Sequence, residues 1–409
     1  MIIKTPQFST LPKLFLNSAK IVVMYISIFL LFFLDSGFYP VQNLSGTIIL
    51  LINIAAILGL VITSGEILKI NKRLLFFYIL LIFPVIASGI IFSSIKKTTI
   101  LLICVTVGFT VANFLDYQRF KKIYKEVMLF LSVFSLIAML IWAVNPSVIT
   151  MLPVAKQTTS TFYNAVFSIV SSSTFSTRNY GIFWEPGAYA IFLNVALLYE
   201  MTDKKQSLIK MLIFMITIFT TFSTLGIVCL ANLILVYLLN KNTGAKNHKR
   251  NKTVVLLISI IAVIYIFYKG EVFIDRVFGK LTDTANGETH LSTSTRINAV
   301  IYPFKAFAEA PFFGVGYTEF TRISQEYCNS MATCTFLNWL AIYGIFGFLF
   351  IFFCIAPFLS HGKTPIAKFG LLVFSILLFS TESFLQIGFI YIFVFYGAKK
   401  ISTRNFSDS

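Results

Sequence analysis

The chain has 409 residues, of which 57% are hydrophobic and 12% are charged, whereas about 25% of the residues in an average soluble domain are charged. The net charge of +17 suggests a nucleic-acid partner at first sight, but the basic residues are spread over short segments between apolar runs. The composition therefore excludes a soluble nucleic-acid-binding domain and predicts a polytopic membrane protein.

Apolar runs of about 20 residues, the length that crosses a bilayer as a helix, recur along the chain. We predict twelve spans, near residues 21–38, 44–64, 74–94, 98–115, 127–144, 184–201, 208–222, 224–239, 253–268, 335–358, 366–381 and 384–398. No soluble domain, low-complexity linker or repeat is evident. The expected fold is an all-α bundle of about twelve transmembrane helices that forms one domain over residues 1–409.

Lys and Arg divide unevenly between the two sides of these spans. The two termini and the loops 65–73, 116–126, 202–210, 240–252 and 359–368 hold 23 of the 33, and the opposite side holds 10. Cytoplasmic loops carry the excess of Lys and Arg, so both termini are predicted to be cytoplasmic. The first apolar run is long enough to stay in the membrane, so we expect no cleavable signal.

Two predicted outside loops, 145–183 and 269–334, are long enough to suggest function. Residues 160–177 are apolar and rich in hydroxyls, which predicts a segment along the membrane interface. Residues 293–310 predict an amphipathic helix against the bundle, capped by Ser294 or Thr293, with Arg296 in its first turn and a kink at Pro303. Its expected apolar stripe is Ile297, Val300, Ile301, Phe304 and Ala308.

Several kinds of site are missing from the sequence. It has no Gly-x-x-x-x-Gly-Lys phosphate loop, no Gly-x-Gly-x-x-Gly and no Asp-x-Asp pair. His248, His290 and His361 lie in three different loops, so none of these loops holds a histidine cluster for a metal. We expect neither a cofactor nor a catalytic metal.

The outside face carries the charged side chains Arg178, Glu185, Arg296, Lys305, Glu319, Arg322, Glu326 and Glu382. Arginine presents a planar fork that holds phosphate oxygens bidentately. Arg178 and Arg296, brought together from two loops, would therefore clamp a diphosphate. For Arg178 the alternative is a lipid-headgroup contact or a salt bridge to Glu185, and for Arg296 it is a solvated charge on a helix face. For Arg322 and Lys305 a solvated surface charge is the simpler explanation.

Glu185 precedes Pro186 at the start of a predicted helix, beside Trp184. It either accepts a proton from a sugar hydroxyl, if partial burial raises its pKa, or only caps the helix start. Residues 220–226 predict a tight turn or a broken helix. The hydroxyls there, including Ser223 and Thr224, either meet a polar ligand or satisfy their own backbone.

Four pieces of sequence resemble the O-antigen polymerase and ligase superfamily of bacterial envelope glycosyltransferases, and most closely its Wzy-type O-antigen polymerases. They are Arg178-x-x-Gly181-x-x-x-Glu185-Pro186-Gly187-Ala188 followed by Phe192-Leu193-Asn194; Thr221-x-Ser223-Thr224-x-Gly226; Arg296 with Pro311-x-x-Gly314-x-Gly316 and Phe320; and Asn338 with Tyr343-Gly344-x-x-Gly347. The resemblance covers roughly residues 175–350 in motifs and the whole chain in hydropathy.

The resemblance implies a multi-span, metal-independent and inverting enzyme of the bacterial inner membrane. It would transfer an undecaprenyl-diphosphate-linked glycan onto the non-reducing end of a lipid-linked repeat unit at the periplasmic face. A chain-length regulator and a flippase would be its further partners. Arg178, Arg296 and Glu185 become the catalytic candidates. The substrate-binding candidates are Tyr180, Trp184, Ser223, Thr224, Lys305, Arg322 and Asn338.

Ligases of the superfamily transfer the glycan to lipid A-core and are expected to have a histidine near the start of the span after the long loop. That region reads Cys334-Thr-Phe-Leu-Asn338 here, which favours a polymerase. A ligase and a flippase or other transporter remain alternatives. Cys328 and Cys334, in the second long loop, either form a disulfide in an oxidising compartment or stay free thiols.

Overall fold

The computed structural model describes residues 11–38, 41, 43–64, 70–157, 161–172, 178–240, 250–257, 291–328, 331–380 and 382–404. The helices are α1 (Leu11–Asp35), α3 (Gly46–Ser64), α4 (Lys72–Ile91), α5 (Ile95–Phe114), α6 (Tyr117–Val144), α7 (Pro146–Thr150), α8 (Pro186–Thr202), α9 (Leu208–Thr220), α10 (Thr224–Leu239), α13 (Leu291–Glu309), α14 (Gly316–Cys328), α15 (Thr335–Tyr343), α16 (Gly347–Leu359), α17 (Pro365–Phe379) and α18 (Gly388–Arg404). The predicted all-α membrane fold is confirmed.

Among the described residues, six helical segments are long and apolar enough to cross a membrane, and α9, α10 and α17 are shorter apolar helices. The predicted runs coincide with helices except 253–268, most of which lies outside the described residues. Side-chain caps mark several helix starts, as sequence rules predict. Asp116, for example, accepts hydrogen bonds from the backbone N–H groups of Gln118 and Arg119, both at 3.0 Å, at the start of α6.

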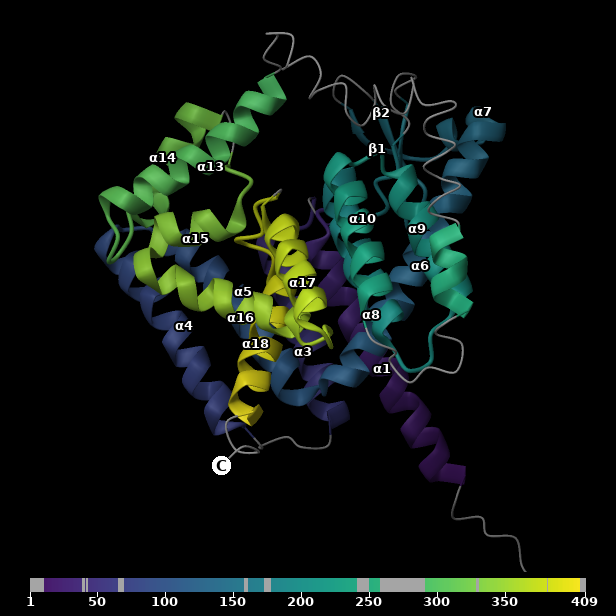
Figure 1. Ribbon diagram of the computed structural model, residues 1–409, viewed down its shortest axis with the longest axis horizontal. Helices are drawn as coiled ribbons and strands as arrows, with labels where there is room; N and C mark the ends of the chain where they lie inside the picture. The colour runs from purple at the N-terminus through teal and green to yellow at the C-terminus, as the bar shows by residue number, and fades with distance from the viewer. Residues whose placement is uncertain are drawn as a thin grey trace, which may run out of the picture.

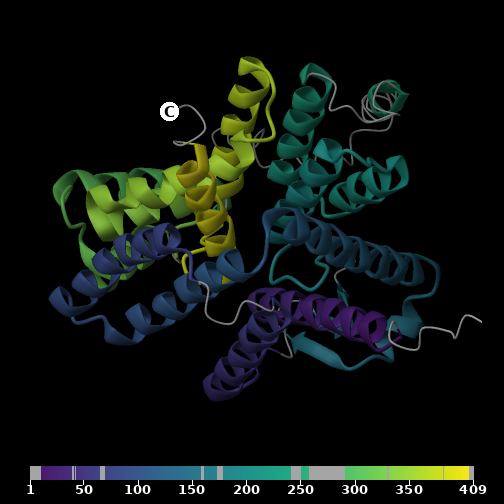
Figure 2. The ribbon, with the colours of Figure 1, turned by 90° about the horizontal axis from the view of Figure 1, so that it is seen from below.

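The long segments that precede α8 and α15 lie on the same side of the bundle. In Figure 1, α1 begins and α18 ends at the bottom, whereas α13, α14 and a small β-sheet lie at the top. We call these the terminal side and the loop side. Figures 1 and 2 show α8–α10 and α13–α15 on opposite sides of α17 and α18. The loop between α17 and α18 therefore lies between the two segments that carry the candidate residues.

The first long loop contains α7 and a three-stranded antiparallel sheet, β1 (Val154–Gln157), β2 (Thr161–Asn164) and β3 (Ile169–Ser171), in that order. This sheet was not predicted from the sequence. Its β-branched and aromatic residues favour strands, and cross-strand pairs such as Phe162 with Ser171 set the register. Val170 is buried against Ala138 of α6 and against Ile149, which fixes the sheet on the bundle.

The expected helix over 293–310 is present as α13, but its orientation differs from the prediction. Ile297 and Phe304 are 51% and 56% exposed, whereas the small residues Ala299 and Ala306 are buried. Small residues allow membrane helices to approach closely, and large apolar side chains gain nothing by leaving lipid for protein. Because α13 begins at Leu291, Arg296 lies beyond its first turn.

α13 ends at Glu309, just before Pro311 and Gly314, and a second helix, α14, starts at Gly316. A Cβ atom on Gly314 would lie 2.3 Å from the backbone of Ile342, so only glycine fits there. The predicted span 335–358 is also interrupted, by a 3₁₀ turn at Gly344–Phe346 (η1) between α15 and α16. Val315 N–H donates to the Ala341 carbonyl at 2.8 Å, which ties the two irregular regions together.

Candidate active site

The segment that leads into α8 is held in place by Asn179. Its backbone N–H donates to the Thr220 carbonyl at 2.9 Å, and its side-chain Nδ2 donates to Ser135 Oγ at 3.0 Å. Gly181 adopts a left-handed conformation with φ +52°, and its N–H donates to Asn179 Oδ1 at 3.0 Å. A Cβ atom on Gly181 would lie 2.7 Å from the Tyr189 ring, so the motif glycine is required by both backbone and space.

Arg178 is fixed on the turn between α9 and α10. Its Nε donates to the Thr221 carbonyl at 3.0 Å and its Nη2 donates to the Phe222 carbonyl at 2.9 Å. Phe222 has φ +46°, which is unusual for a residue other than glycine and marks local strain. These bonds use two of the five N–H donors of the guanidinium. Among the residues that the structure describes, this guanidinium has no other hydrogen-bond acceptor, so three donors remain for an anionic ligand, in a fixed orientation.

Two helices begin beside this arginine, and their starts differ. Ser223 caps α10, since its Oγ accepts a hydrogen bond from Gly226 N–H at 3.2 Å. Glu185 is the N-cap residue of α8, but its side chain makes no capping hydrogen bond. Helix N-termini attract negative charge, so the site has two positive helix ends in addition to Arg178.

The Glu185 carboxyl group points instead to Glu382, from the loop between α17 and α18. Both carboxyl groups lie close to Gly187. The oxygens nearest to a Cβ atom built on Gly187 are Glu382 Oε1 at 3.3 Å, Ser223 Oγ at 3.8 Å and Glu185 Oε1 at 3.9 Å. The two carboxyl groups share a hydrogen bond. The negative charge of a neighbouring carboxylate disfavours the ionised form of a carboxyl group.

Glu382 is the residue that sequence reasoning missed. It was counted among the outside charges but was not among the site candidates. The side chain is only 8% exposed. Burial raises the pKa of Glu382 well above its ordinary value, Glu185 adds to the rise, and Arg296 and a hydrogen bond from the Trp184 side chain oppose it. The raised pKa favours the protonated form of Glu382, and in that form Glu382 can donate a hydrogen bond to Glu185.

Thr335 holds Glu382 in position. Its Oγ1 donates to the Glu382 carbonyl at 2.6 Å and accepts from Phe384 N–H at 2.9 Å. The only sequence signal for Glu382 was a lone acidic residue in a two-residue gap between predicted spans, which does not reveal its burial.

Tyr180 and Arg296 complete the cluster. Burial lowers the pKa of Arg178, whereas the nearby Tyr180 and Glu185 raise it and Arg296 lowers it. Arg296, on α13, also acts on Glu382. The structure thus brings Arg296 within electrostatic reach of Arg178 and of Glu382, although it comes from a different loop. Arg296 is exposed, unlike Arg178, which is partly buried.

Comparison with protein families bears on this arrangement. Residues 209–352 match the family model described as O-antigen ligase. This part of the chain is therefore similar to the O-antigen ligase family. The match runs from α9 into α16 and includes Ser223 and Arg296. It confirms the resemblance to the O-antigen polymerase and ligase superfamily and supports a ligase- or polymerase-type function without distinguishing the two. No curated protein matches the chain.

Two further candidates in the matched region, Arg322 and Lys305, have other partners. Arg322 bridges Glu319 and Glu326 on the exposed face of α14, with N–O distances of 2.6 and 2.8 Å. Lys305 lies over the Tyr302 ring, 5.1 Å from its centroid.

Asn338 is buried and donates to the Ala332 carbonyl at 2.6 Å. Within the described part of the chain, its Oδ1 has no hydrogen-bond partner. Thr224, the first residue of α10, is half-buried next to Ser223. Cys328 and Cys334, in the same matched region, are buried and are not joined to each other by a disulfide.

Proposed function

We propose that this protein is an O-antigen polymerase of the bacterial inner membrane, with both termini in the cytoplasm. It would move a growing glycan from undecaprenyl diphosphate onto the non-reducing end of a lipid-linked repeat unit at the periplasmic face. The observation that carries the proposal is the convergence of Arg178, Glu185, Arg296 and Glu382 on the loop side of a membrane bundle. It joins an anion-binding group to a proton-accepting group.

The arginines would bind the diphosphate of the donor. Arg178 is fixed by two carbonyls and keeps three donors for phosphate oxygens. Arg296, exposed on α13, would approach the same diphosphate from the other side. When the bond between the anomeric carbon and the diphosphate oxygen breaks, negative charge grows on that oxygen. Preorganised donors stabilise such charge more in the transition state than in the ground state.

The carboxyl pair would handle the proton of the acceptor. Glu185 in its carboxylate form accepts the proton of the acceptor hydroxyl while the hydroxyl oxygen attacks the anomeric carbon opposite the leaving group. The attack forms the new glycosidic bond, inverts the anomeric centre and releases undecaprenyl diphosphate. Glu382 supports Glu185 by donating a hydrogen bond to it and by holding the second proton of the pair. Trp184 and Tyr180 would border the sugar.

Polymerase rather than ligase is favoured by the start of α15, where the histidine expected of ligases is replaced by Cys334-Thr-Phe-Leu-Asn338. A flippase would need cationic side chains lining a cavity deep among the spans. The cations of the candidate cluster lie instead at helix starts and on α13, which suits a reaction at one membrane face.

The test is a polysaccharide gel of a strain that lacks the gene, complemented with wild type or with Arg178→Ala. A polymerase predicts lipid A-core with a single repeat in the deletion strain and a ladder with wild type only. Bare lipid A-core in the deletion strain would indicate a ligase or a flippase and would overturn the proposal. Long chains in the deletion strain would overturn it as well.

A further inference from the structure

An apolar groove follows α16 on its way to the terminal side, away from the carboxyl cluster. It has a volume of about 760 Å³, which falls in the range of about 300–1,000 Å³ that is usual for ligand sites. Its lining is almost entirely aliphatic and aromatic and includes Phe348, Phe352 and Leu359 of α16, Leu372 of α17 and Ile401 of α18. Such a lining suits a hydrocarbon chain.

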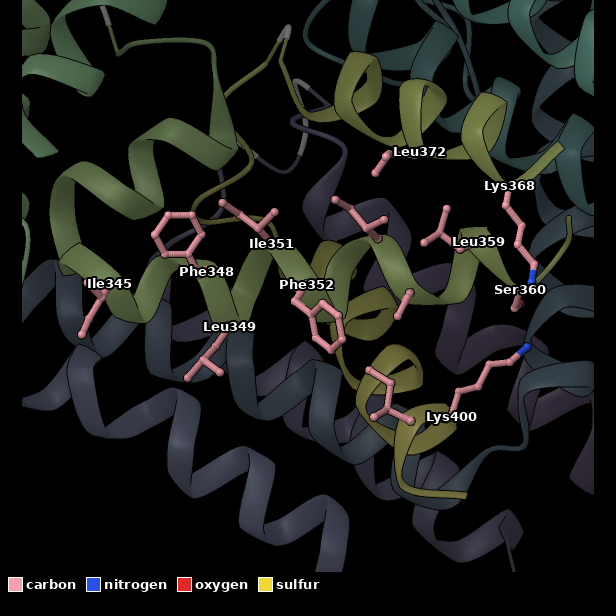
Figure 3. A pocket seen from close by; sticks show the side chains of 13 residues that line it. Ile345, Phe348, Leu349, Ile351, Phe352, Leu359, Ser360, Lys368, Leu372 and Lys400 are labelled. Atoms are coloured by element: carbon pink, nitrogen blue, oxygen red, sulfur yellow. The ribbon is translucent and has the colours of Figure 1, made fainter. Parts of the chain in front are cut away.

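Two lysines close one end of this groove. Figure 3 shows the side chains of Lys368, from the first turn of α17, and Lys400, from α18, extending toward the same place beside Ser360. The positive charge of Lys400 also disfavours the positively charged forms of Lys121 and His361. An anion at this end would therefore relieve the mutual repulsion of ammonium groups.

We propose that this groove binds an anionic phospholipid. One acyl chain would lie along α16, and the phosphate would sit between Lys368 and Lys400. Basic pockets between transmembrane helices on the cytoplasmic side are recognised by anionic headgroups. The positive-inside assignment places the start of α17 on that side. The occupant is thus a lipid of the cytoplasmic leaflet.

This ligand is different from the donor lipid of the proposed reaction. Lys368 lies in the first turn of α17, whereas Glu382 lies just beyond the other end of this helix, which ends at Phe379. The length of α17 therefore separates the two residues. A diphosphate held by Arg178 and Arg296 would lie at the Glu382 end. The groove proposal therefore stands independently of the polymerase proposal.

The experiment is native mass spectrometry of the purified full-length protein in detergent, titrated with phosphatidylglycerol or with phosphatidylcholine of the same acyl chains. We expect wild type to prefer phosphatidylglycerol. Lys368→Gln with Lys400→Gln should weaken phosphatidylglycerol binding about 30-fold, since each lysine near an anionic lipid contributes on the order of a fivefold gain. Ala356→Trp, which fills the groove, should weaken the binding of both lipids.

Two control variants make the result specific. Lys204→Gln with Lys205→Gln removes the same two charges from exposed positions between α8 and α9 and should leave binding unchanged. Lys368→Arg with Lys400→Arg keeps both charges and should retain phosphatidylglycerol. Equal loss in the Lys204 and Lys205 variant would show a diffuse electrostatic belt and overturn the site. The site would also be overturned if phosphatidylglycerol binding were unchanged in Lys368→Gln with Lys400→Gln, or in Ala356→Trp.

Discussion

Arg178 gives the sharpest test of the proposed chemistry. Arg178→Ala removes the two hydrogen bonds to the carbonyls of Thr221, at 3.0 Å, and Phe222, at 2.9 Å. Leaving a buried carbonyl without a partner costs about 1–3 kcal/mol of folding stability. Losing one preorganised donor to a developing oxyanion slows catalysis about 100- to 1,000-fold, or about 2.7–4 kcal/mol. The variant should therefore fold with reduced stability, and its rate should fall by at least 100-fold.

Arg178→Lys separates charge from geometry. An ammonium on a flexible stem cannot donate to two carbonyls and a diphosphate in one plane, so we expect a loss close to that of alanine. The assay is the single-turnover rate of dimer formation by purified protein from a synthetic lipid-linked repeat unit. Arg322→Ala is the matched control, because this exposed arginine pairs only with Glu319 and Glu326 of its own helix among the described residues.

The control variant should stay within about twofold of wild type, because exposed ion pairs contribute little. If Arg178→Ala retained more than a tenth of the wild-type rate with equal amounts of folded protein, the clamp would be wrong. The same conclusion would follow if Arg322→Ala lost as much activity as Arg178→Ala.

Three further predictions concern the carboxyl groups. Glu185→Gln should lower the same single-turnover rate about 100-fold or more, as loss of a general base does; near-normal turnover would reduce Glu185 to a helix-start residue. Because burial and Glu185 raise the pKa of Glu382, the folded protein binds that proton more tightly than the unfolded chain, so stability is lost as pH rises above the unfolded value of about 4.3. Between pH 5 and 8 the unfolding midpoint of wild type should fall relative to that of Glu382→Gln, and parallel midpoints would contradict this. At the terminal side, Lys125 Nζ lies 2.9 Å from Glu200 Oε2, and Lys125→Ala should destabilise the protein by about 3–5 kcal/mol; the double variant Lys125→Met with Glu200→Gln should recover most of the loss in a thermal unfolding scan.

Membrane hydropathy made most of the fold predictable. A helix in lipid must satisfy its own backbone, so each apolar run outside 253–268 had only one stable conformation, and the helices confirm it. The same rule failed where water or protein satisfies the backbone. Thr161–Asn164 and Ile169–Ser171 lie in the long loop before α8, where the backbone groups of one strand hydrogen-bond to those of the other instead of forming a helix.

The candidate site was predictable only in part, since a single sequence shows motif residues but not the contacts between distant segments. Arg178, Glu185 and Arg296 were recognised by charge and spacing. Glu382 was not, because its place in the site follows from a contact between segments far apart in the sequence: its Oε1 lies 3.3 Å from a Cβ atom built on Gly187. The stripe on α13 was misjudged for a related reason. Helical periodicity identifies an apolar face, but in a membrane it does not say whether protein or lipid covers that face.

A comparison of two acidic clusters in the described part of the chain argues that the Glu185–Glu382 pair has more than a structural role. On the terminal side, Glu200 and Asp203 are both matched by the ammonium of Lys125. On the loop side, Glu382 is buried against another carboxyl group, and the start of α8 lacks the side-chain cap that typically contributes about 1 kcal/mol. Both features cost stability, and an amide at either position would remove much of that cost. Proteins keep such arrangements where a reaction needs a carboxyl group that exchanges its proton near neutral pH. A diphosphate bound by the neighbouring arginines would add negative charge beside the pair. That charge would favour proton uptake by Glu185 at the moment when the acceptor hydroxyl must lose its proton.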